Sequence, residues 1–389
     1  MTDNKIKSIE LTPVFVPFKK EVRATMDSGE GGHGMAIPTD EPWQGGEAVI
    51  CQIFTSDGMV GLGEMLVWLP ETGVSPNQII DAVQNELYKY ILGEDPHNIQ
   101  KINQKMDNNV ARTEVAKGLL DMACYDLMGQ ISGKPACEIL GGKQLDEIPL
   151  TALVPLADLR TMKFMSRGFV RSGYQSVRYK LGRNIEEDRE ISRLIRETLG
   201  PEIKLRVDYN QAYEPKEAVR AIKAIEPYGI SAAEQPVNKD DYLGMVYVQQ
   251  RVNTPIFAHE GFFSLRDFIV LAELGAVKAA GINLERPGGI TNALKVIEYA
   301  KKKNMGTIIH SQPLGIGTAA LIHLAAATYD SLGFFPELFG DIMLEDDLIR
   351  NPINYNKGMV EVPKGPGWGI KLDEENLEKY ATGSKVIIE

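Results

Sequence analysis

A regular alternation of strand-like and helix-like segments fills the second part of the sequence and limits the folds that it can adopt. Seven short apolar runs follow one another between residues 149 and 311: PLTALV, SVRYKLG, IKLRVDYN, ISAAEQP, TPIFAHE, KAAGINL and MGTIIHS. Amphipathic stretches such as NIEEDREISRLIRETLG and ITNALKVIEYAKKKN separate them and have helical periodicity. Strand–helix units repeated in this way predict an α/β fold in which parallel strands close into a barrel rather than form an open sheet.

The N-terminal part of the chain has a different pattern, which predicts an α+β domain. IKSIELTPVFVPF and AVICQIFTSDGMVGLGEM are strand-like, the second with a turn at Asp57-Gly58, and helical periodicity extends from about Pro76 to Gln130. Residues 26–47 are rich in glycine and proline, which predicts a lid-like loop. We expect an α+β capping domain over residues 1–140, a barrel domain over residues 141–365, and a C-terminal segment, 366–389, that returns to the cap.

Charge and composition limit the partners of this 389-residue chain. The formal net charge of -11 at pH 7 argues against nucleic acid, although a bound cation would still permit a small anionic substrate. No apolar run is long enough to span a membrane, and MTDNKIKSIELTPVFVPF has polar residues where a signal peptide needs an apolar core. The three cysteines (Cys51, Cys124 and Cys137) form no metal-binding spacing. We therefore expect a cytoplasmic homo-oligomer that acts on a small molecule, without nucleic acid or membrane partners.

Polar residues end nearly every apolar run. In a barrel of this kind the carboxyl ends of the strands carry the chemistry. Asp208, Glu234 and the pair His259 and Glu260 end three consecutive runs, so they are expected at neighbouring points of one rim. Each acid alone would more often be a helix N-cap, and His259 alone a core histidine, but their coincidence on three strands favours a divalent-cation site. Two carboxylates and a third ligand suit Mg²⁺.

The run SVRYKLG contributes two cations to the same rim. Residues i and i+2 of a strand share a face, so Arg178 and Lys180 are both expected to point into the barrel while Tyr179 points outward. A lysine beside an arginine and facing a bound cation is expected to have a lowered pKa. Lys180 is therefore predicted to act as a base near neutral pH.

These residues resemble the enolase superfamily, in its mandelate racemase and muconate lactonizing branch. The resemblance covers almost the whole chain and rests on GLGEM, DMACYDLMGQISGKPACEILGG, VDYNQ, AEQP, RPGGITNALKV, GIGTAALIHLAAA and PGWGIKLDEENLEKY. It implies an α+β cap over a (β/α)₇β barrel. It also implies Mg²⁺ that stabilises the enolate formed by removal of a proton next to a carboxylate.

Departures from the family pattern carry further information. The usual Lys-x-Lys motif is Arg178-x-Lys180, the sixth strand offers Asn283 instead of a base, and His310 lacks the aspartate partner typical of the family. The third ligand is His259 if counted as in the muconate branch and Glu260 if counted as in the mandelate branch. Mg²⁺ prefers oxygen ligands, and this preference favours Glu260. Spacing favours His259, which we prefer, and with Arg178 it makes the chain similar to acid-sugar dehydratases resembling galactarate dehydratase.

The resemblance implies dehydration of an acid sugar to a 2-keto-3-deoxy acid as the leading function. Lys180 would remove the proton and His310 would serve as the acid, with Mg²⁺ itself or a residue of the cap as the alternatives. The alternatives are a racemase, epimerase or cycloisomerase that forms the same enolate, or a barrel that binds ligand without catalysis. Trp43 and Trp68 are candidates for substrate contact, with core packing as the alternative. The other expected substrate-binding residues are His33 in the cap and Asn210, Asn283 and Gln312 in the barrel.

Overall fold

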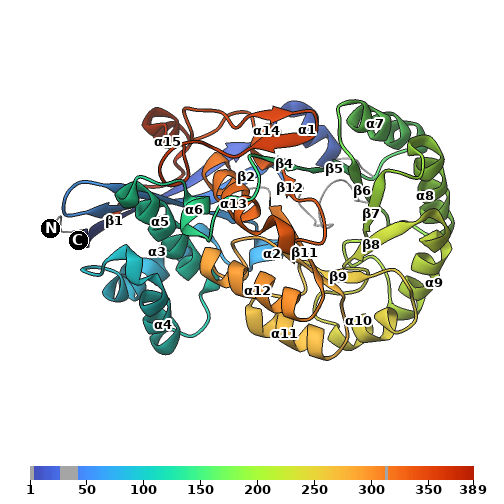
Figure 1. Cartoon of the computed structure of the whole chain (residues 1–389), viewed down its shortest axis with the longest axis horizontal. Coiled ribbons are helices and arrows are strands. Elements are labelled where there is room, and N and C mark those ends of the chain that lie inside the picture. The colour runs from blue at the N-terminus through green and yellow to red at the C-terminus, as the bar shows by residue number, and fades with distance from the viewer. Residues whose placement is uncertain (1–3, 27–42, 312–313) are drawn as a thin grey trace.

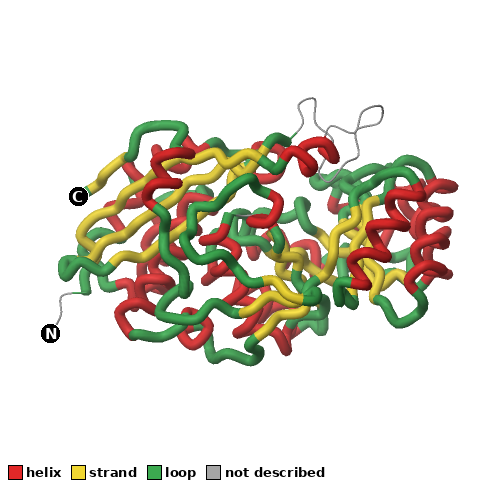
Figure 2. The backbone as a smooth tube through the Cα atoms, turned by 90° about the horizontal axis from the view of Figure 1, so that it is seen from above, coloured by secondary structure: helices red, strands yellow, loops and turns green. Residues whose placement is uncertain are grey.

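A sheet-and-helix layer and a barrel lie side by side in the computed structural model, which describes residues 4–26, 43–311 and 314–389 (Figure 1). The two parts remain distinct when the molecule is viewed from above, with the long antiparallel strands at one end and the barrel at the other (Figure 2). The predicted His33 and Gln312 lie outside the described residues, as does most of the predicted loop 26–47. Within that range, Gly45–Glu47 already belong to a strand.

The barrel is an eight-stranded parallel sheet, as the family resemblance implies; the sequence pattern located seven of its strands. Its strands occur in the order β12-β11-β10-β9-β8-β7-β6-β5. Their bounds are β5 Thr151–Val154, β6 Ser176–Lys180, β7 Lys204–Asp208, β8 Ile230–Glu234, β9 Ile256–Ala258, β10 Ala279–Ile282, β11 Gly306–Ser311 and β12 Glu337–Leu338. The backbone N–H of Thr151 donates to the Pro336 carbonyl at 2.8 Å, which links the first strand to the segment before the last and nearly closes the barrel.

Helices cover the outside of the barrel, and capping side chains mark where several of them begin. Their bounds are α7 Leu159–Arg171, α8 Ile185–Leu199, α9 Pro215–Ile225, α10 Tyr242–Gln249, α11 Leu265–Glu273, α12 Ile290–Lys302 and α13 Gly315–Thr328. The side chain of Asn184 accepts a hydrogen bond from the Glu187 N–H, and that of Ser264 accepts one from the Asp267 N–H. These two residues are the N-caps at which α8 and α11 begin. Ile191 and Ile195, on the apolar face of α8, are buried.

The N-terminal layer contains an antiparallel sheet of order β15-β1-β2-β3. Its strands are β1 Ile6–Pro17, β2 Gly45–Thr55, β3 Val60–Val67 and, from the C-terminus, β15 Val386–Ile388. The predicted continuous helical region is divided by turns, because α3 Pro76–Asn85, α4 Ile99–Asn109 and α5 Glu114–Ser132 are separate. The described residues also form shorter α-helices, α1 Lys20–Met26, α2 Leu69–Thr72, α6 Ala136–Ile139, α14 Gly340–Met343 and α15 Glu374–Tyr380, and a small sheet of β4 Glu147–Pro149, β13 Tyr355–Asn356 and β14 Met359–Glu361. The domain boundaries at residues 140 and 365 stay predictions.

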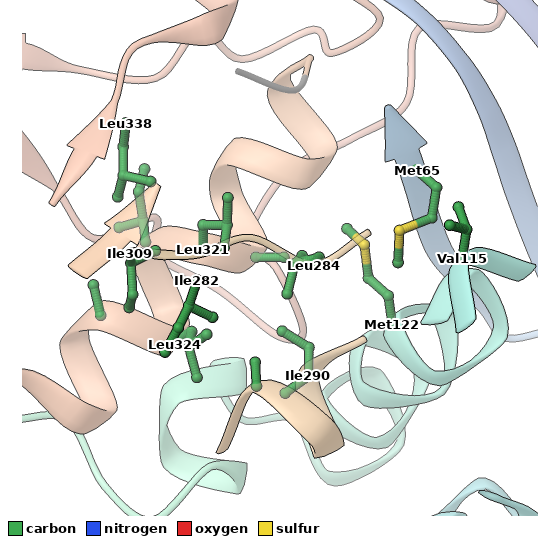
Figure 3. Close-up of a cluster of buried hydrophobic side chains, with 14 of the residues drawn as sticks. Met65, Val115, Met122, Ile282, Leu284, Ile290, Ile309, Leu321, Leu324 and Leu338 are labelled. Atoms are coloured by element: carbon green, nitrogen blue, oxygen red, sulfur yellow. The ribbon is translucent and has the colours of Figure 1, made fainter. Parts of the chain in front are cut away.

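Apolar side chains join the N-terminal layer to the mouth of the barrel. Figure 3 shows Met65 of β3 with Val115 and Met122 of α5, close to Leu284 and Ile290, which flank the loop after β10. All five side chains are buried. The packing therefore holds α5 against the loop that connects β10 to α12.

Small residues allow this close approach. A Cβ atom at Gly118 of α5 would lie 2.5 Å from the backbone N of Gly289, and one at Gly289 would lie 2.6 Å from Oδ2 of Asp121. That same oxygen accepts the backbone N–H of Thr291 at 2.9 Å. The loop 284–290 is thus fixed by α5 on one side and by the barrel on the other.

Replacement of Gly118 by alanine tests this contact. We expect Gly118→Ala to lower the free energy of unfolding by about 1–3 kcal/mol, because the added methyl group overpacks the contact with the Gly289 backbone. Urea denaturation measures the change. Gly168→Ala is the control, since Gly168 lies in helix α7 and a methyl group added there would have no neighbouring atom within 4 Å. That variant is expected to be unchanged or more stable by about 0.5–1 kcal/mol, and equal effects at both positions would contradict the account.

Two further polar contacts tie the parts together. Glu64 of β3 accepts the backbone N–H groups of Leu314 at 2.6 Å and of Gly317 at 3.0 Å, at the N-terminus of α13. His323 of α13 is a structural residue: its Nδ1 accepts the Cys137 N–H at 3.2 Å and its Nε2 lies 3.1 Å from the Trp368 carbonyl. Burial lowers the pKa of His323 to about 4, so the ring is neutral. Across the described ranges, no helix has both the length and the apolar character that crossing a membrane would require.

Candidate active site

Side chains from consecutive strands meet at the carboxyl ends of β6, β7 and β8. The parallel register pairs Lys180 with Asp208, and Asp208 with Glu234, so that one rim carries all three. His259 and Glu260 follow directly after β9. Each of these residues is at least 97% buried, so their charges interact with little screening by water.

Arg178 lies at the centre of this group. Its Nε is 3.2 Å from Oε2 of Glu234, and its Nη2 donates to Oδ2 of Asp208. Its Nη1 donates to Oε2 of Glu337, from β12 on the other side of the nearly closed barrel, at 2.7 Å. Burial alone would lower the pKa of Arg178, but the charge of Asp208 and then that of Glu234 raise it. The guanidinium therefore acts as a fixed positive charge that holds three carboxylates.

Lys180 points into the same group, as predicted from its place two residues after Arg178. Its Nζ donates to Oδ2 of Asp208 at 2.5 Å and to Oδ1 of Asn210. Burial lowers the pKa of Lys180 from its usual value, with Asp208 opposing the shift and Arg178 adding to it. The direction is the one that the sequence predicted, although burial rather than a neighbouring charge is the main cause.

Both oxygens of Asp208 are occupied by donors from the chain. Oδ1 accepts the backbone N–H of Asn210 at 2.9 Å, and Oδ2 accepts from Lys180 and Arg178. Burial would raise the pKa of Asp208, but the charges of Arg178 and Lys180 outweigh it and hold the pKa below its usual range. Asp208 is therefore an ionised partner of two cations.

Glu234, His259 and Glu260 form a second group next to the first. Nδ1 of His259 lies 3.3 Å from Oε1 of Glu234 and 3.5 Å from Oε2 of Glu260, and Gln211 donates to Oε1 of Glu260 at 3.2 Å. Burial raises the pKa values of Glu234 and Glu260, and it lowers that of His259 well below its usual value. The ring is therefore neutral, which is the form that can bind a metal ion.

A divalent cation fits this second group. Oε1 of Glu234, Nε2 of His259 and Oε2 of Glu260 are buried and have no hydrogen-bond partner. Buried polar atoms without a partner are costly, and lone pairs left open on carboxylate and imidazole groups suit a cation. The choice between His259 and Glu260 as a ligand stays a prediction.

His310 is the penultimate residue of β11 and has a partner that the sequence did not reveal. The register pairs it directly with Glu337 of β12, whose Oε2 lies 3.4 Å from Nε2 of His310. The same Nε2 accepts from Nη1 of Arg178 at 2.9 Å. The aspartate typical of the family is thus absent from the sequence, but a carboxylate from the adjacent strand lies beside the ring. Burial lowers the pKa of His310 well below its usual value.

Three other charged residues of the site were not predicted. Arg206 shares its strand face with Asp208 and reaches Glu234 at 3.5 Å, so the same i, i+2 argument would have found it. Arg286 is buried in the loop after β10, and its Nη1 lies 3.4 Å from Oε2 of Glu71 in α2. That ion pair joins the cap to the barrel, and no local sequence pattern indicates it.

The predicted substrate-binding residues are spread over two places. Asn210 contacts Lys180, and the buried Asn283 accepts the Arg286 backbone N–H at 3.3 Å. Trp43 and Trp68 stack on each other with ring centroids 4.8 Å apart, and Trp43 also packs on the hydrophobic core. Substrate contact by these four residues stays a prediction.

Comparison with known proteins identifies the family. A family model described as "Enolase C-terminal domain-like" matches residues 161–376, and a model of the mandelate racemase / muconate lactonizing enzyme N-terminal domain matches residues 33–141. The chain belongs to the enolase superfamily. Its mandelate racemase and muconate lactonizing branch is the one that the sequence motifs indicated.

Several known members resemble this enolase-superfamily chain along most of its length. The hydrophobic dipeptide epimerase of Enterococcus faecalis is 36% identical over 72% of this chain and 79% of its own length. The crystal structure of N-succinyl Arg/Lys racemase from Bacillus cereus matches with a TM-score of 0.87 and 26% identity, covering 99% of this chain and 100% of that chain. The crystal structure of a muconate lactonizing enzyme from Pseudomonas fluorescens, complexed with muconolactone, matches with a TM-score of 0.88 and 26% identity. The match covers 97% of this chain and 100% of that chain.

These similarities confirm the predicted barrel and cap. They also correct the predicted function. This enolase-superfamily enzyme resembles epimerases, racemases and lactonizing enzymes, so the acid-sugar dehydratase prediction has no support among them. The alternative from the sequence, an isomerase that forms the same enolate, fits the relatives better.

Proposed function

We propose that this protein is an isomerase that moves one proton at the carbon next to the carboxylate of a small substrate. Lys180 removes that proton as the enolate forms, and the electron pair of the enolate then breaks the bond to an oxygen on the neighbouring carbon, as in the opening of a lactone. In the reverse direction that bond forms and Lys180 returns the proton. The proposal is supported by the relatives, whose names identify dipeptides, N-succinyl amino acids and muconolactone as substrates or ligands. The observation that carries it is the environment of Lys180, which is buried, lies against Asp208 and has a lowered pKa.

The roles of the surrounding side chains follow from charge. Asp208 and Asn210 orient the amine of Lys180, and burial makes its neutral form accessible, so it can accept a proton. Arg178 and Arg206 balance the carboxylates that line the barrel. A divalent cation beside Glu234 and His259 would supply positive charge to offset the charge that develops on the substrate carboxylate. Mg²⁺ is the cation expected from the family resemblance.

A single base is favoured because the sixth-strand position offers no second one. Asn283 is a neutral amide that accepts a backbone hydrogen bond, and it cannot exchange a proton. An epimerase with bases on both faces of the substrate is the second candidate. It is favoured by the buried His310, whose Nδ1 has no hydrogen-bond partner and could serve as the second group.

Hydrogen exchange in deuterated water separates these candidates. We would incubate the cation-loaded protein with a hydrophobic dipeptide, an N-succinyl amino acid and muconolactone, and follow the α-hydrogen by NMR. The proposal predicts replacement of that hydrogen by deuterium with retained configuration, since one base acts from one face. Deuterium incorporated with inversion would favour the epimerase with His310. Exchange with none of the three would contradict an isomerase for these substrate classes.

A further inference from the structure

A buried carboxylate in the first turn of α8 links two loops at the rim of the barrel. Asp188 is completely buried, which an aspartate tolerates only when its oxygens have partners. Its Oδ1 accepts the backbone N–H of Gly182 at 2.9 Å, and its Oδ2 accepts the hydroxyl of Tyr213 at 2.7 Å. Gly182 lies in the loop between β6 and α8, and Tyr213 lies in the loop between β7 and α9. One side chain therefore joins both loops.

The two linked loops adjoin the proposed base and its amide partner. Lys180 ends β6 just before Gly182, and its amine donates to Oδ1 of Asn210, which lies in the same loop as Tyr213. The loops also touch each other, because a Cβ atom at Gly182 would lie only 2.5 Å from the Cβ of Ala212. A displacement of either loop would therefore change the contact between the amine of Lys180 and Asn210.

The loop after β7 has a strained backbone that needs such an anchor. Asn210 and Gln211 have φ angles of 42° and 67°, in the left-handed region that residues other than glycine rarely adopt. Such conformations persist only where the surrounding contacts hold them. The backbone N–H of Gln211, which donates to the Gln235 carbonyl at 2.7 Å, is one of these contacts. The hydrogen bond from Tyr213 to Asp188 is another.

We propose that Asp188 is a positioning residue for Lys180, because its carboxylate fixes the loops after β6 and β7 so that the amine stays against Asn210. The proposal rests on the proposed function for the identity of the base. An ionised carboxylate only accepts hydrogen bonds, whereas a protonated one carries a hydrogen on one oxygen and has less capacity to accept. The link between the loops is therefore complete only while Asp188 is ionised.

The surroundings of Asp188 allow this link to respond to pH. Burial raises the pKa of Asp188 to about 6, the hydrogen bonds that it accepts oppose the shift, and the charge of Glu187 on the same helix adds to it. The other titratable groups around it are Tyr179 of β6 and the two tyrosines beside β7, Tyr209 and Tyr213, and burial raises the pKa of all three. The tyrosines therefore stay neutral while Asp188 gains its proton.

Carbon-13 NMR of protein labelled at the lysine ε-carbon tests this role without substrate. The full-length protein would be saturated with Mg²⁺, and Lys180→Arg would assign the Lys180 resonance. Asp188→Asn keeps the shape of the side chain but carries hydrogens at one position, as the protonated acid does. Above the pKa of Asp188 we expect the Lys180 resonance to differ between the wild type and Asp188→Asn. This difference should disappear as the pH falls through about 6. Glu186→Gln is the control, since Glu186 lies in the same turn with its side chain 86% exposed, and it should match the wild type throughout.

Two results of the NMR experiment would overturn the proposal. One is a Lys180 resonance that is the same in the wild type and Asp188→Asn at every pH, and the other is a difference that pH does not change. Tyr213→Phe removes one of the two hydrogen bonds and keeps the ring, so it should move the Lys180 resonance in the same direction even if Asp188→Asn fails to fold.

Turnover gives a second measurement of the same role. Above the pKa of Asp188, Asp188→Asn is expected to lower kcat by about 10- to 100-fold with KM unchanged, because a displaced catalytic group weakens the transition state rather than substrate binding. An unchanged kcat would also overturn the proposal. Absence of isomerase activity in the wild type would count against the proposed function alone, since the NMR comparison does not depend on turnover.

Discussion

Replacement of Lys180 by alanine is expected to lower the turnover rate by about 10²- to 10⁴-fold, the range for loss of a positioned base. The physical reason is that the described rim offers no other lysine: the neighbouring position holds Arg178, and the sixth strand offers Asn283. Lys180→Arg is expected to be nearly as damaging, because a guanidinium does not give up its proton in the accessible pH range. Steady-state kinetics at saturating cation measure both effects.

A control on the adjacent strand separates the base from a general effect of removing a lysine. Lys204 begins β7 at the end of the barrel opposite Asp208 and is exposed, so Lys204→Ala is expected to keep the wild-type rate. Circular dichroism and thermal unfolding would show that the Lys180 variants are folded. Wild-type turnover in Lys180→Ala would mean that another residue takes the proton, with His310 the first candidate.

The second large effect concerns stability. We expect Arg178→Met to lower the free energy of unfolding by about 3–5 kcal/mol, since it leaves buried carboxylates of Asp208, Glu234 and Glu337 without their shared cation. A divalent cation is expected to recover part of the loss, because it binds the folded state and supplies positive charge beside Glu234. Urea denaturation with and without cation measures both changes.

A matched surface substitution calibrates this result. Arg193 lies on α8 and pairs with Glu197 at 2.8 Å, but both side chains are largely exposed to water. Arg193→Met is expected to change stability by about 0–1 kcal/mol, as is typical of surface ion pairs, with no response to the cation. If Arg178→Met were as stable as Arg193→Met, the central role given to Arg178 would be wrong.

The barrel could be predicted from the sequence because its pattern is local. Each of the seven apolar runs is long enough to show strand character, and capped helices separate them, so the alternation is visible without tertiary information. The eighth strand was missed because β12 is only two residues long and carries no periodicity. That short strand brings Glu337 into the site. Because the strand was not predicted, the contacts of Glu337 with Arg178 and His310 were not predicted either.

The site residues could be predicted where they lie on one strand or on consecutive strands. They could not be predicted where two segments distant in the sequence meet. Alternation along β6 indicated that Arg178 and Lys180 point inward, and spacing between strands indicated that Asp208 and Glu234 are neighbours. The contact of Arg178 with Glu337 joins residues from opposite ends of the barrel sequence and depends on its near closure. The pair Arg286 and Glu71 likewise depends on how the cap docks. Burial, the main cause of the lowered pKa of Lys180, is a tertiary property as well.

Loss of the α-deuterium of a labelled substrate to ordinary water tests the central claim most directly, because it reports proton removal apart from any later step. With the cation-loaded wild-type protein, NMR should show deuterium replaced by hydrogen at that carbon at least as fast as product forms. In Lys180→Ala the replacement should stop while the protein stays folded and still binds the cation. Replacement at the wild-type rate in Lys180→Ala, or product that keeps all of its α-deuterium, would contradict the claim that Lys180 removes this proton.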